Sequence, residues 1–189
     1  MSYLTLSQLQ GRADFSDHMR ENLSRKSQTF KTLVFLSHSH QDADIVGQVI
    51  NFLLTHGAHV YVDWMDPSMP ATTSGETAAK IKVKIAESDR FLVLLSENSV
   101  NSKWVPWELG YADGVKPIEN IAILPVRRNS STADATFNGL EYMTLYPVVQ
   151  EGFREGKGYF SIFPPGRIGD PKVGRYFDHY WLYPGEVYM

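Results

Sequence analysis

Short apolar runs that alternate with stretches of helical spacing constrain the fold of this chain more than any other feature of its sequence. The runs at 32–37, 91–96 and 121–126 consist almost entirely of apolar residues, without a regular alternation of polar ones. Such runs are typical of strands covered on both faces, as in a parallel sheet. Two further runs, at 58–63 and 143–149, bring the predicted number of strands to five.

Between the predicted strands, apolar residues recur at helical spacing. One helix is expected over 44–55, with Gly57 as a stop. A second is expected to open at Thr73, whose spacing from Glu76 is that of a capping box. Strand and helix therefore alternate along this part of the chain.

This alternation predicts an α/β fold of the doubly wound, flavodoxin-like kind: a five-stranded parallel sheet with helices on both faces. In such sheets ligands bind beyond the carboxyl ends of the strands. The loops after Ser37, Asp63 and Ser96 follow three of the predicted strands. We expect a functional site where these loops meet.

Three regions differ in composition along the 189 residues. Residues 1–30 are polar and are expected to form an N-terminal appendage with an amphipathic helix near 15–23. Residues 31–149 form the predicted α/β domain. Residues 150–189 are rich in aromatic side chains, which predicts an extension that packs back on the domain.

Charge and residue usage exclude several classes of protein. A net charge of -3 and a pI near 6.1 argue against a protein that binds nucleic acid or anionic membranes. Without cysteine there is no disulfide framework and no thiolate nucleophile. No run reaches the roughly 20 apolar residues of a spanning helix. We expect a soluble, cytoplasmic protein.

A third helix is predicted after the strand at 91–96. Asn101 or Ser102 can cap its first amides, and Pro106 is tolerated because it falls in the first turn. Gly114 is its predicted stop. These local signals therefore predict where the helix begins, but not which residues surround it.

Glu108 stands out because it is a carboxylate within this apolar, aromatic helix start. Trp104 lies four residues earlier on the same face, with Trp107 and Tyr111 beside it. A carboxylate against indole rings can act as a base or nucleophile, or bind a sugar hydroxyl. The alternative is structural: Glu108 forms a salt bridge or faces solvent near the helix start.

The polar loop that follows the first strand offers weaker signals. His38, His40 and Asp42 suggest a metal site, but no further spaced histidine supports it, and we predict no metal. The glycines of a phosphate loop are missing, as is the Gly-x-Ser-x-Gly of a hydrolase. Asp42 is most simply the N-cap of the next helix.

The loop from Trp64 to Gly75 is long for a connection within a compact α/β unit. Its apolar side chains suit a lid over a ligand or a contact with another protein. A surface turn that is held on the core by Trp64 is the structural alternative.

Two motifs together give the chain a family resemblance. Val-Phe-Leu-Ser-His-Ser at 34–39 and Ser-Lys-Trp-Val-Pro-Trp-Glu-Leu at 102–109, with the long loop between them, resemble a Toll/interleukin-1 receptor (TIR) domain over about 32–148. The resemblance implies cleavage of the nicotinamide–ribose bond of NAD by Glu108. It also implies that Ser37, His38, Trp64 and Trp104 line the substrate site, with NAD as substrate and no cofactor.

The resemblance is strongest to TIR proteins of the Thoeris antiphage system. It implies that ADP-ribose is cyclised into a diffusible signal for a partner effector, ThsA, that a phage component acts as trigger, and that the protein can form homo-oligomers. Pro106 and Trp107 depart from the family pattern. Two alternatives stay open: a non-enzymatic TIR adaptor, and a nucleoside deoxyribosyltransferase-like enzyme.

Overall fold

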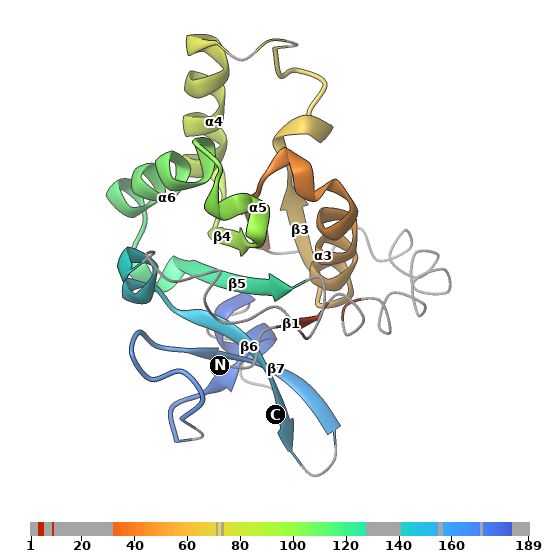
Figure 1. Cartoon of the computed structure of the whole chain (residues 1–189), viewed down its shortest axis with the longest axis vertical. Helices are drawn as coiled ribbons and strands as arrows, with labels where there is room; N and C mark the ends of the chain where they lie inside the picture. Colours follow the sequence, from red (N-terminus) through yellow and green to blue (C-terminus); the bar gives the residue numbers. More distant parts are fainter. Residues whose placement is uncertain are drawn as a thin grey trace.

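A parallel sheet forms the centre of the protein, as the alternating pattern predicts (Figure 1). The computed structural model describes residues 4, 5, 9, 32–70, 72, 74–127, 141–154, 157–170 and 172–182. Within these residues the parallel strands follow the order β3-β2-β4-β5-β6. Their bounds are β2 (Thr32–Ser37), β3 (Ala58–Tyr61), β4 (Arg90–Leu95), β5 (Ile121–Arg127) and β6 (Val148–Arg154). This order confirms the flavodoxin-like prediction.

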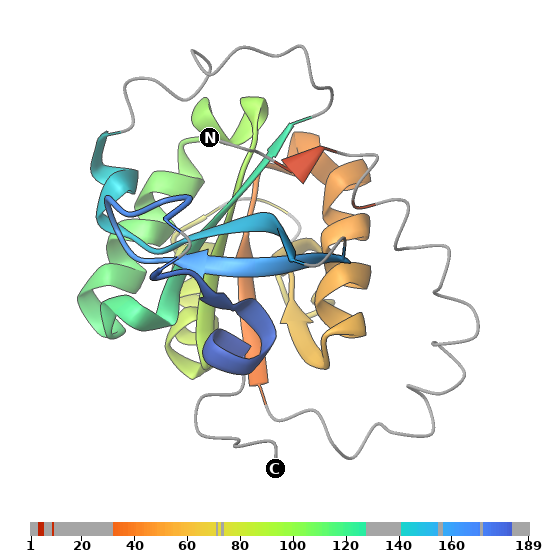
Figure 2. The same cartoon turned by 90° about the horizontal axis from the view of Figure 1, so that it is seen from below.

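Helices cover both faces of this sheet, and Figure 2 shows α3 on one side with α4 and α6 on the other. The helices are α3 (Ala43–Thr55), α4 (Gly75–Glu87), α5 (Glu97–Val100) and α6 (Trp104–Val115). Short 3-10 turns lie in the connections between strands and helices: η1 (His40–Asp42), η2 (Asp63–Met65), η3 (Ile118–Asn120) and η5 (Glu141–Leu145). No helix among the described residues has the length and apolar character to cross a bilayer.

Two apolar cores result, one on each side of the sheet. Val34 and Leu36 of β2 belong to the core under α3, whereas Phe35 belongs to the core under α4 and α6. Leu92 and Val93 of β4 divide in the same way. Because successive side chains of a strand point to opposite faces, an entirely apolar run fills both cores at once.

Antiparallel strands continue the sheet beyond β6. They are β7 (Lys157–Phe163), which pairs with β6, and β8 (Arg175–Tyr176), which pairs with β7. The π-helical turn η6 (Phe177–Leu182) follows, and its Phe177, Trp181 and Leu182 are buried in the core under α3. Near the other end of the chain, β1 (Leu4–Thr5) pairs with the end of β5, and Leu9 is buried in the same core.

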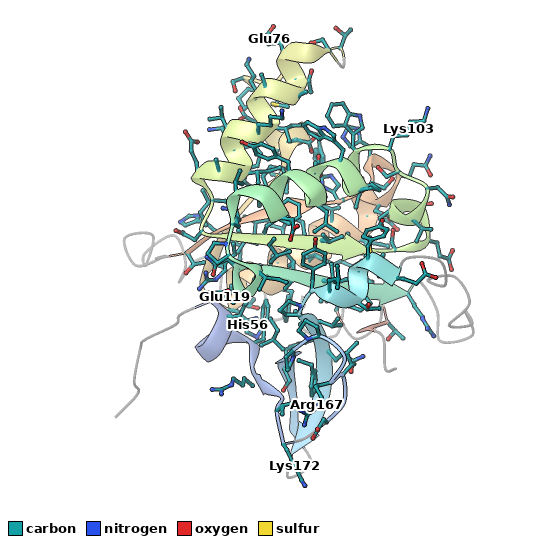
Figure 3. The ribbon with its side chains drawn as sticks, turned by 90° about the vertical axis from the view of Figure 1, so that its left-hand side faces the viewer. His56, Glu76, Lys103, Glu119, Arg167 and Lys172 are labelled. Atoms are coloured by element: carbon teal, nitrogen blue, oxygen red, sulfur yellow. The ribbon has the colours of Figure 1, made fainter. Side chains whose placement is uncertain are left out.

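The amino ends of the strands are held by this C-terminal turn. Thr32 Oγ1 donates to the Leu182 carbonyl at 2.5 Å, and Arg90 Nε donates to the Trp181 carbonyl at 2.5 Å. The indole of Trp181 donates to the Glu119 carbonyl at 2.9 Å. Glu119 and His56 lie where the C-terminal segment meets the rest of the domain, and Lys172 lies at the far tip of that segment (Figure 3).

Two predicted helix ends are wrong. Helix α4 begins at Gly75, with Ser74 as its cap: Thr77 N donates to Ser74 Oγ, and Ser74 N donates to Thr77 Oγ1. A threonine hydroxyl thus does what the predicted glutamate would do; Thr73 lies outside the described residues. Helix α6 continues past Gly114 and ends at Val115, because its C-cap Lys116 precedes Pro117 and is driven into an extended conformation.

Gly57 is the predicted stop that is confirmed, with a φ of 80°. The fifth strand is shifted: residues 141–145 form η5, which buries Met143, and β6 begins at Val148 after Pro147. Proline has no amide hydrogen for a ladder, so the strand starts beyond it. The predicted helix near 15–23 lies outside the described residues.

Candidate active site

The candidate site lies at the carboxyl edge of the parallel sheet, where loop residues from β2 and β3 meet helix α6. Ser37 is the last residue of β2, and Asp63 follows β3 at the start of η2. Strands β2 and β3 are parallel neighbours, so their carboxyl ends lie side by side. Glu108, in the second turn of α6, completes the group.

Glu108 is buried and points at the end of β2. Ser37 Oγ donates a hydrogen bond to Glu108 Oε2 over 2.5 Å, and the two residues are 1% and 5% exposed. Burial raises the pKa of Glu108 to about 8; the Ser37 hydrogen bond opposes this shift, and the negative charge of Asp63 adds to it. The structural alternative of a solvent-facing glutamate is therefore wrong.

The start of α6 is set by local hydrogen bonds. Ser102 Oγ accepts from the amides of Trp104 and Val105 at 3.2 and 3.3 Å, so Ser102 is confirmed as a capping residue. Val105, Leu109 and neighbouring apolar side chains pack into the core under α6. Glu108 shares their buried face, and for that reason its carboxyl faces the sheet.

His38 is held as a neutral imidazole. Its Nδ1 donates to the Leu36 carbonyl at 3.0 Å, and its Nε2 accepts from the Trp64 indole at 2.8 Å. This pattern requires the proton on Nδ1. Burial lowers the pKa of His38, against the opposing effects of the Leu36 carbonyl and the charge of Asp63. Both ring nitrogens of His38 thus make hydrogen bonds. The bond to Nε2 holds the Trp64 indole in place, although 49% of the surface of Trp64 is exposed.

Asp63 joins this group, although its role was not anticipated from sequence. Its Oδ2 accepts from His40 Nε2 at 3.2 Å, and its Oδ1 lies 3.8 Å from His38 Nε2. Oδ1 is buried and has no hydrogen-bond partner among the described residues. Its place at the end of the strand next to β2 was the available signal, because neighbouring parallel strands end at one edge.

Asp42 occupies the N-cap position of α3, as predicted, but its buried side chain makes no capping hydrogen bond. Its carboxylate accepts from Ser96 Oγ and, at 2.7 Å, from Asn98 Nδ2. The 3-10 turn η1 precedes α3 and places Asp42 toward the loop after β4, while Ser39 caps that turn. The carboxylate therefore ties the loop after β2 to the loop after β4.

Trp104 lies one turn before Glu108 and is half-buried against the core under α6. Its ring meets that of Trp107 edge to face, with centroids 5.2 Å apart. Trp107 stacks on Tyr111, and Lys82 Nζ lies over both rings at 5.7 and 5.2 Å. The predicted aromatic surface thus turns partly toward α4, away from the carboxylate.

The structure therefore brings four predicted residues into one connected group: Ser37 bonds Glu108, His38 is the next residue, and Trp64 bonds His38. Within the described part of the chain, no group of three or more acidic, histidine or cysteine side chains is arranged to hold a metal ion. The group combines a buried carboxyl of raised pKa with a second carboxylate and an exposed indole. Such an arrangement suits chemistry on a cationic or polyhydroxylated ligand.

Comparison with known proteins defines the class of protein. The TIR domain family matches residues 34–155, and the chain belongs to this family. It is 38% identical over 149 residues to the probable 3' cyclic ADP-D-ribose synthase ThsB' of Bacillus cereus (strain MSX-D12), covering 72% of this chain and 75% of that protein. The resemblance to Thoeris TIR proteins is thereby confirmed.

Two further similarities are more limited. The chain is 29% identical over 82 residues to the putative cyclic ADP-D-ribose synthase TIR2 of Cytobacillus dafuensis, covering 42% of this chain and 22% of that protein. Among solved structures, the TIR domain of the Toll-related receptor TRR-2 from Hydra magnipapillata matches at 16% identity and a TM-score of 0.40. That match covers 57% of this chain and 78% of that one.

Proposed function

We propose that this protein cleaves the nicotinamide–ribose bond of NAD and closes the remaining ADP-ribose into a cyclic product. The observation that carries the proposal is the buried Ser37–Glu108 pair at the carboxyl edge of the sheet. The name of the Bacillus cereus relative, a probable 3' cyclic ADP-D-ribose synthase, supports the same reaction.

Glu108 is the proposed catalytic residue. Nicotinamide already leaves as a neutral ring from a cationic substrate, so the site has mainly to orient the ribose and stabilise an oxocarbenium-like transition state. An ionised carboxylate against that cation does this. The pKa of Glu108, about 8 in the free protein, is expected to fall when the cationic nicotinamide binds beside it. Substrate binding then ionises the group that the reaction needs.

The surrounding side chains have separate proposed roles. Ser37 fixes Oε2 of Glu108 by its hydrogen bond. His38 fixes the exposed indole of Trp64, which is available to stack on a flat ring of NAD. Trp104, one turn before Glu108, is the proposed apolar wall of the site. Exclusion of water by such a wall favours ring closure over hydrolysis.

In the cell, the proposed product is a diffusible signal. The Thoeris resemblance supports a partner effector of the ThsA kind that the signal activates, with a phage component as trigger and both proteins in the cytoplasm. The test is to incubate the purified chain with NAD, alone and with lysate of infected cells, and to measure nicotinamide and ADP-ribose products by mass spectrometry.

Glu108→Gln separates catalysis from folding in this test, because the change is nearly isosteric. We expect loss of nicotinamide release with an unchanged circular dichroism spectrum. Glu97→Gln makes the same change at the start of α5 and is expected to keep full activity. Nicotinamide release by Glu108→Gln at the rate of the unmodified protein would refute the role of Glu108.

A non-enzymatic adaptor is the second candidate within the family. Trp64 and Met65 on η2 are 49% and 58% exposed, and adjacent apolar side chains on a surface turn suit a protein contact. An adaptor needs no carboxyl at Glu108. No nicotinamide release in either condition, together with a partner captured by the chain and lost in Trp64→Ala, would establish the adaptor instead.

A further inference from the structure

Asp63 has an unusual place in the site, because one of its two carboxylate oxygens is buried without a hydrogen bond. Oδ2 accepts from His40, whose side chain is 71% exposed, whereas Oδ1 faces inward, 3.8 Å from His38 Nε2. No described residue donates a hydrogen bond to Oδ1. A buried carboxylate oxygen without a donor costs stability, so a function is the more economical explanation.

The other buried groups that could accept a proton here are already engaged. The hydroxyl of Ser37 is bonded to Glu108. His38 could take a proton only at Nε2, because its Nδ1 already carries one, and Nε2 accepts a hydrogen bond from the Trp64 indole. Glu108 is needed against the cationic centre. Among the described side chains of the site, Asp63 is the one whose buried carboxylate oxygen Oδ1 lacks a hydrogen-bond donor.

We infer that Asp63 is the general base of ring closure: its Oδ1 accepts the proton of the ADP-ribose hydroxyl that attacks the anomeric carbon. This inference rests on the proposed function. The bond from that carbon to the nicotinamide nitrogen breaks, and its electron pair leaves with neutral nicotinamide. A bond from the hydroxyl oxygen to the same carbon forms, and the proton passes to Asp63 and then to solvent. The sum is NAD giving cyclic ADP-ribose, nicotinamide and one proton.

The surroundings of Asp63 support this assignment. The negative charge of Asp63 contributes to the raised pKa of Glu108. Asp63 follows β3, and Glu108 bonds Ser37 at the end of the neighbouring β2, so the two carboxyl groups lie at one edge of the sheet. They stand on different elements, η2 and α6, and can therefore act on different atoms of one substrate. A base positioned for a hydroxyl contributes about 10²- to 10⁴-fold to a rate.

Asp63→Asn keeps the size of the side chain and removes the base. We expect the rate of cyclic product formation to fall by on the order of 10², whereas nicotinamide release falls far less and linear ADP-ribose replaces the cyclic product. The ratio of cyclic to linear ADP-ribose is read by mass spectrometry against total nicotinamide. An unchanged ratio in Asp63→Asn would overturn the inference and leave Glu108 to take both roles.

Asp66→Asn is the matched control. Asp66 lies three residues further on the same loop, where it accepts from Tyr61 and from the Ser68 amide, so the variant makes an identical charge change and also disturbs the loop. Its cyclic to linear ratio should match that of the unmodified protein. A drop in the ratio equal to that of Asp63→Asn would assign the effect to the loop and overturn the inference.

A second readout locates Asp63 beside Glu108. Without the negative charge of Asp63, the acid limb of nicotinamide release should move to lower pH in Asp63→Asn and stay in place in Asp66→Asn. If the unmodified protein releases no nicotinamide, the proposed function itself fails and the inference fails with it. If nicotinamide is released but the ratio of cyclic to linear ADP-ribose is unchanged in Asp63→Asn, only the inference about Asp63 is refuted.

Discussion

The two edges of the parallel sheet use buried polar groups in opposite ways. At the amino edge, Thr32 and Arg90 donate to the carbonyls of the C-terminal turn, and Arg90 also bonds Asn120. At the carboxyl edge, Glu108 is buried so deeply that its pKa rises, and Asp63 keeps an oxygen without a donor. Polar groups that are fully paired stabilise a fold, whereas polar groups buried with too few partners weaken it. The amino edge of the sheet therefore has a structural role, whereas the carboxyl edge is suited to chemistry.

The largest expected effect is a pH-dependent one at the carboxyl edge. Burial raises the pKa of Glu108 from 4.5 to about 8. The unfolded chain therefore ionises before the folded one, and the stability that the protonated carboxyl provides at low pH is lost as the pH rises toward 8. In Glu108→Gln this loss should vanish, a difference of roughly 4 to 5 kcal/mol between pH 4.5 and pH 9.

Urea unfolding of both proteins across this pH range measures that difference. Equal pH dependence in the two proteins would mean that the Glu108 carboxyl is not desolvated, and the contrast between the edges would collapse.

Trp181→Ala tests the amino edge in turn. Trp181 is 1% exposed, stacks on Phe177 and donates to Glu119, so truncation leaves a cavity and an unpaired carbonyl. We expect a loss of about 3 to 5 kcal/mol in the free energy of unfolding, with nicotinamide release per folded molecule unchanged. Trp107→Ala, at a ring 36% exposed, should cost about 1 kcal/mol. A cost for Trp181→Ala as small as the one expected for Trp107→Ala would show that the C-terminal turn contributes little.

The strands and helix caps of the two edges could be predicted from the sequence, whereas their long-range hydrogen bonds could not, for physical reasons. Strands whose residues enter both cores must be apolar throughout, so periodicity located β2, β4 and β5 within a residue. Helix capping is local, and Ser102 was found for that reason. By contrast, the bonds of Arg90 and Thr32 join residues 91 and 150 positions apart, which no local pattern encodes.

The candidate site shows the same division. Glu108 was conspicuous because a carboxyl within an apolar helix face is costly. Asp63 was named only as the end of a strand and was given no role, and for Asp42 the N-cap position was predicted but not the partners of its side chain. Only the structure shows that one faces His38 and the other bonds Ser96 and Asn98 across two loops.

Thr32→Val removes one hydroxyl from the amino edge with almost no change in shape. The carbonyl of Leu182 then loses its donor in a buried place, and we expect a cost of about 1 to 2 kcal/mol in the free energy of unfolding. This cost should be the same at pH 5 and pH 8, because no group with a shifted pKa depends on Thr32. A cost that varies with pH would point to a coupling between the two edges.

Ser37→Ala makes the corresponding change at the carboxyl edge, and it has the smallest expected effect on stability. Its hydroxyl opposes the rise in the pKa of Glu108, so the variant should raise that pKa further and move the acid limb of nicotinamide release to higher pH. A hydrogen bond worth about 1 kcal/mol corresponds to a shift of just under one pH unit. Initial rates of release between pH 5 and pH 9 measure the shift. An acid limb that stays in place in Ser37→Ala would mean that the ionisation of Glu108 does not govern the rate. An acid limb that moves in Ser37→Ala but not in Thr32→Val would show that the polar groups of the carboxyl edge take part in the chemistry.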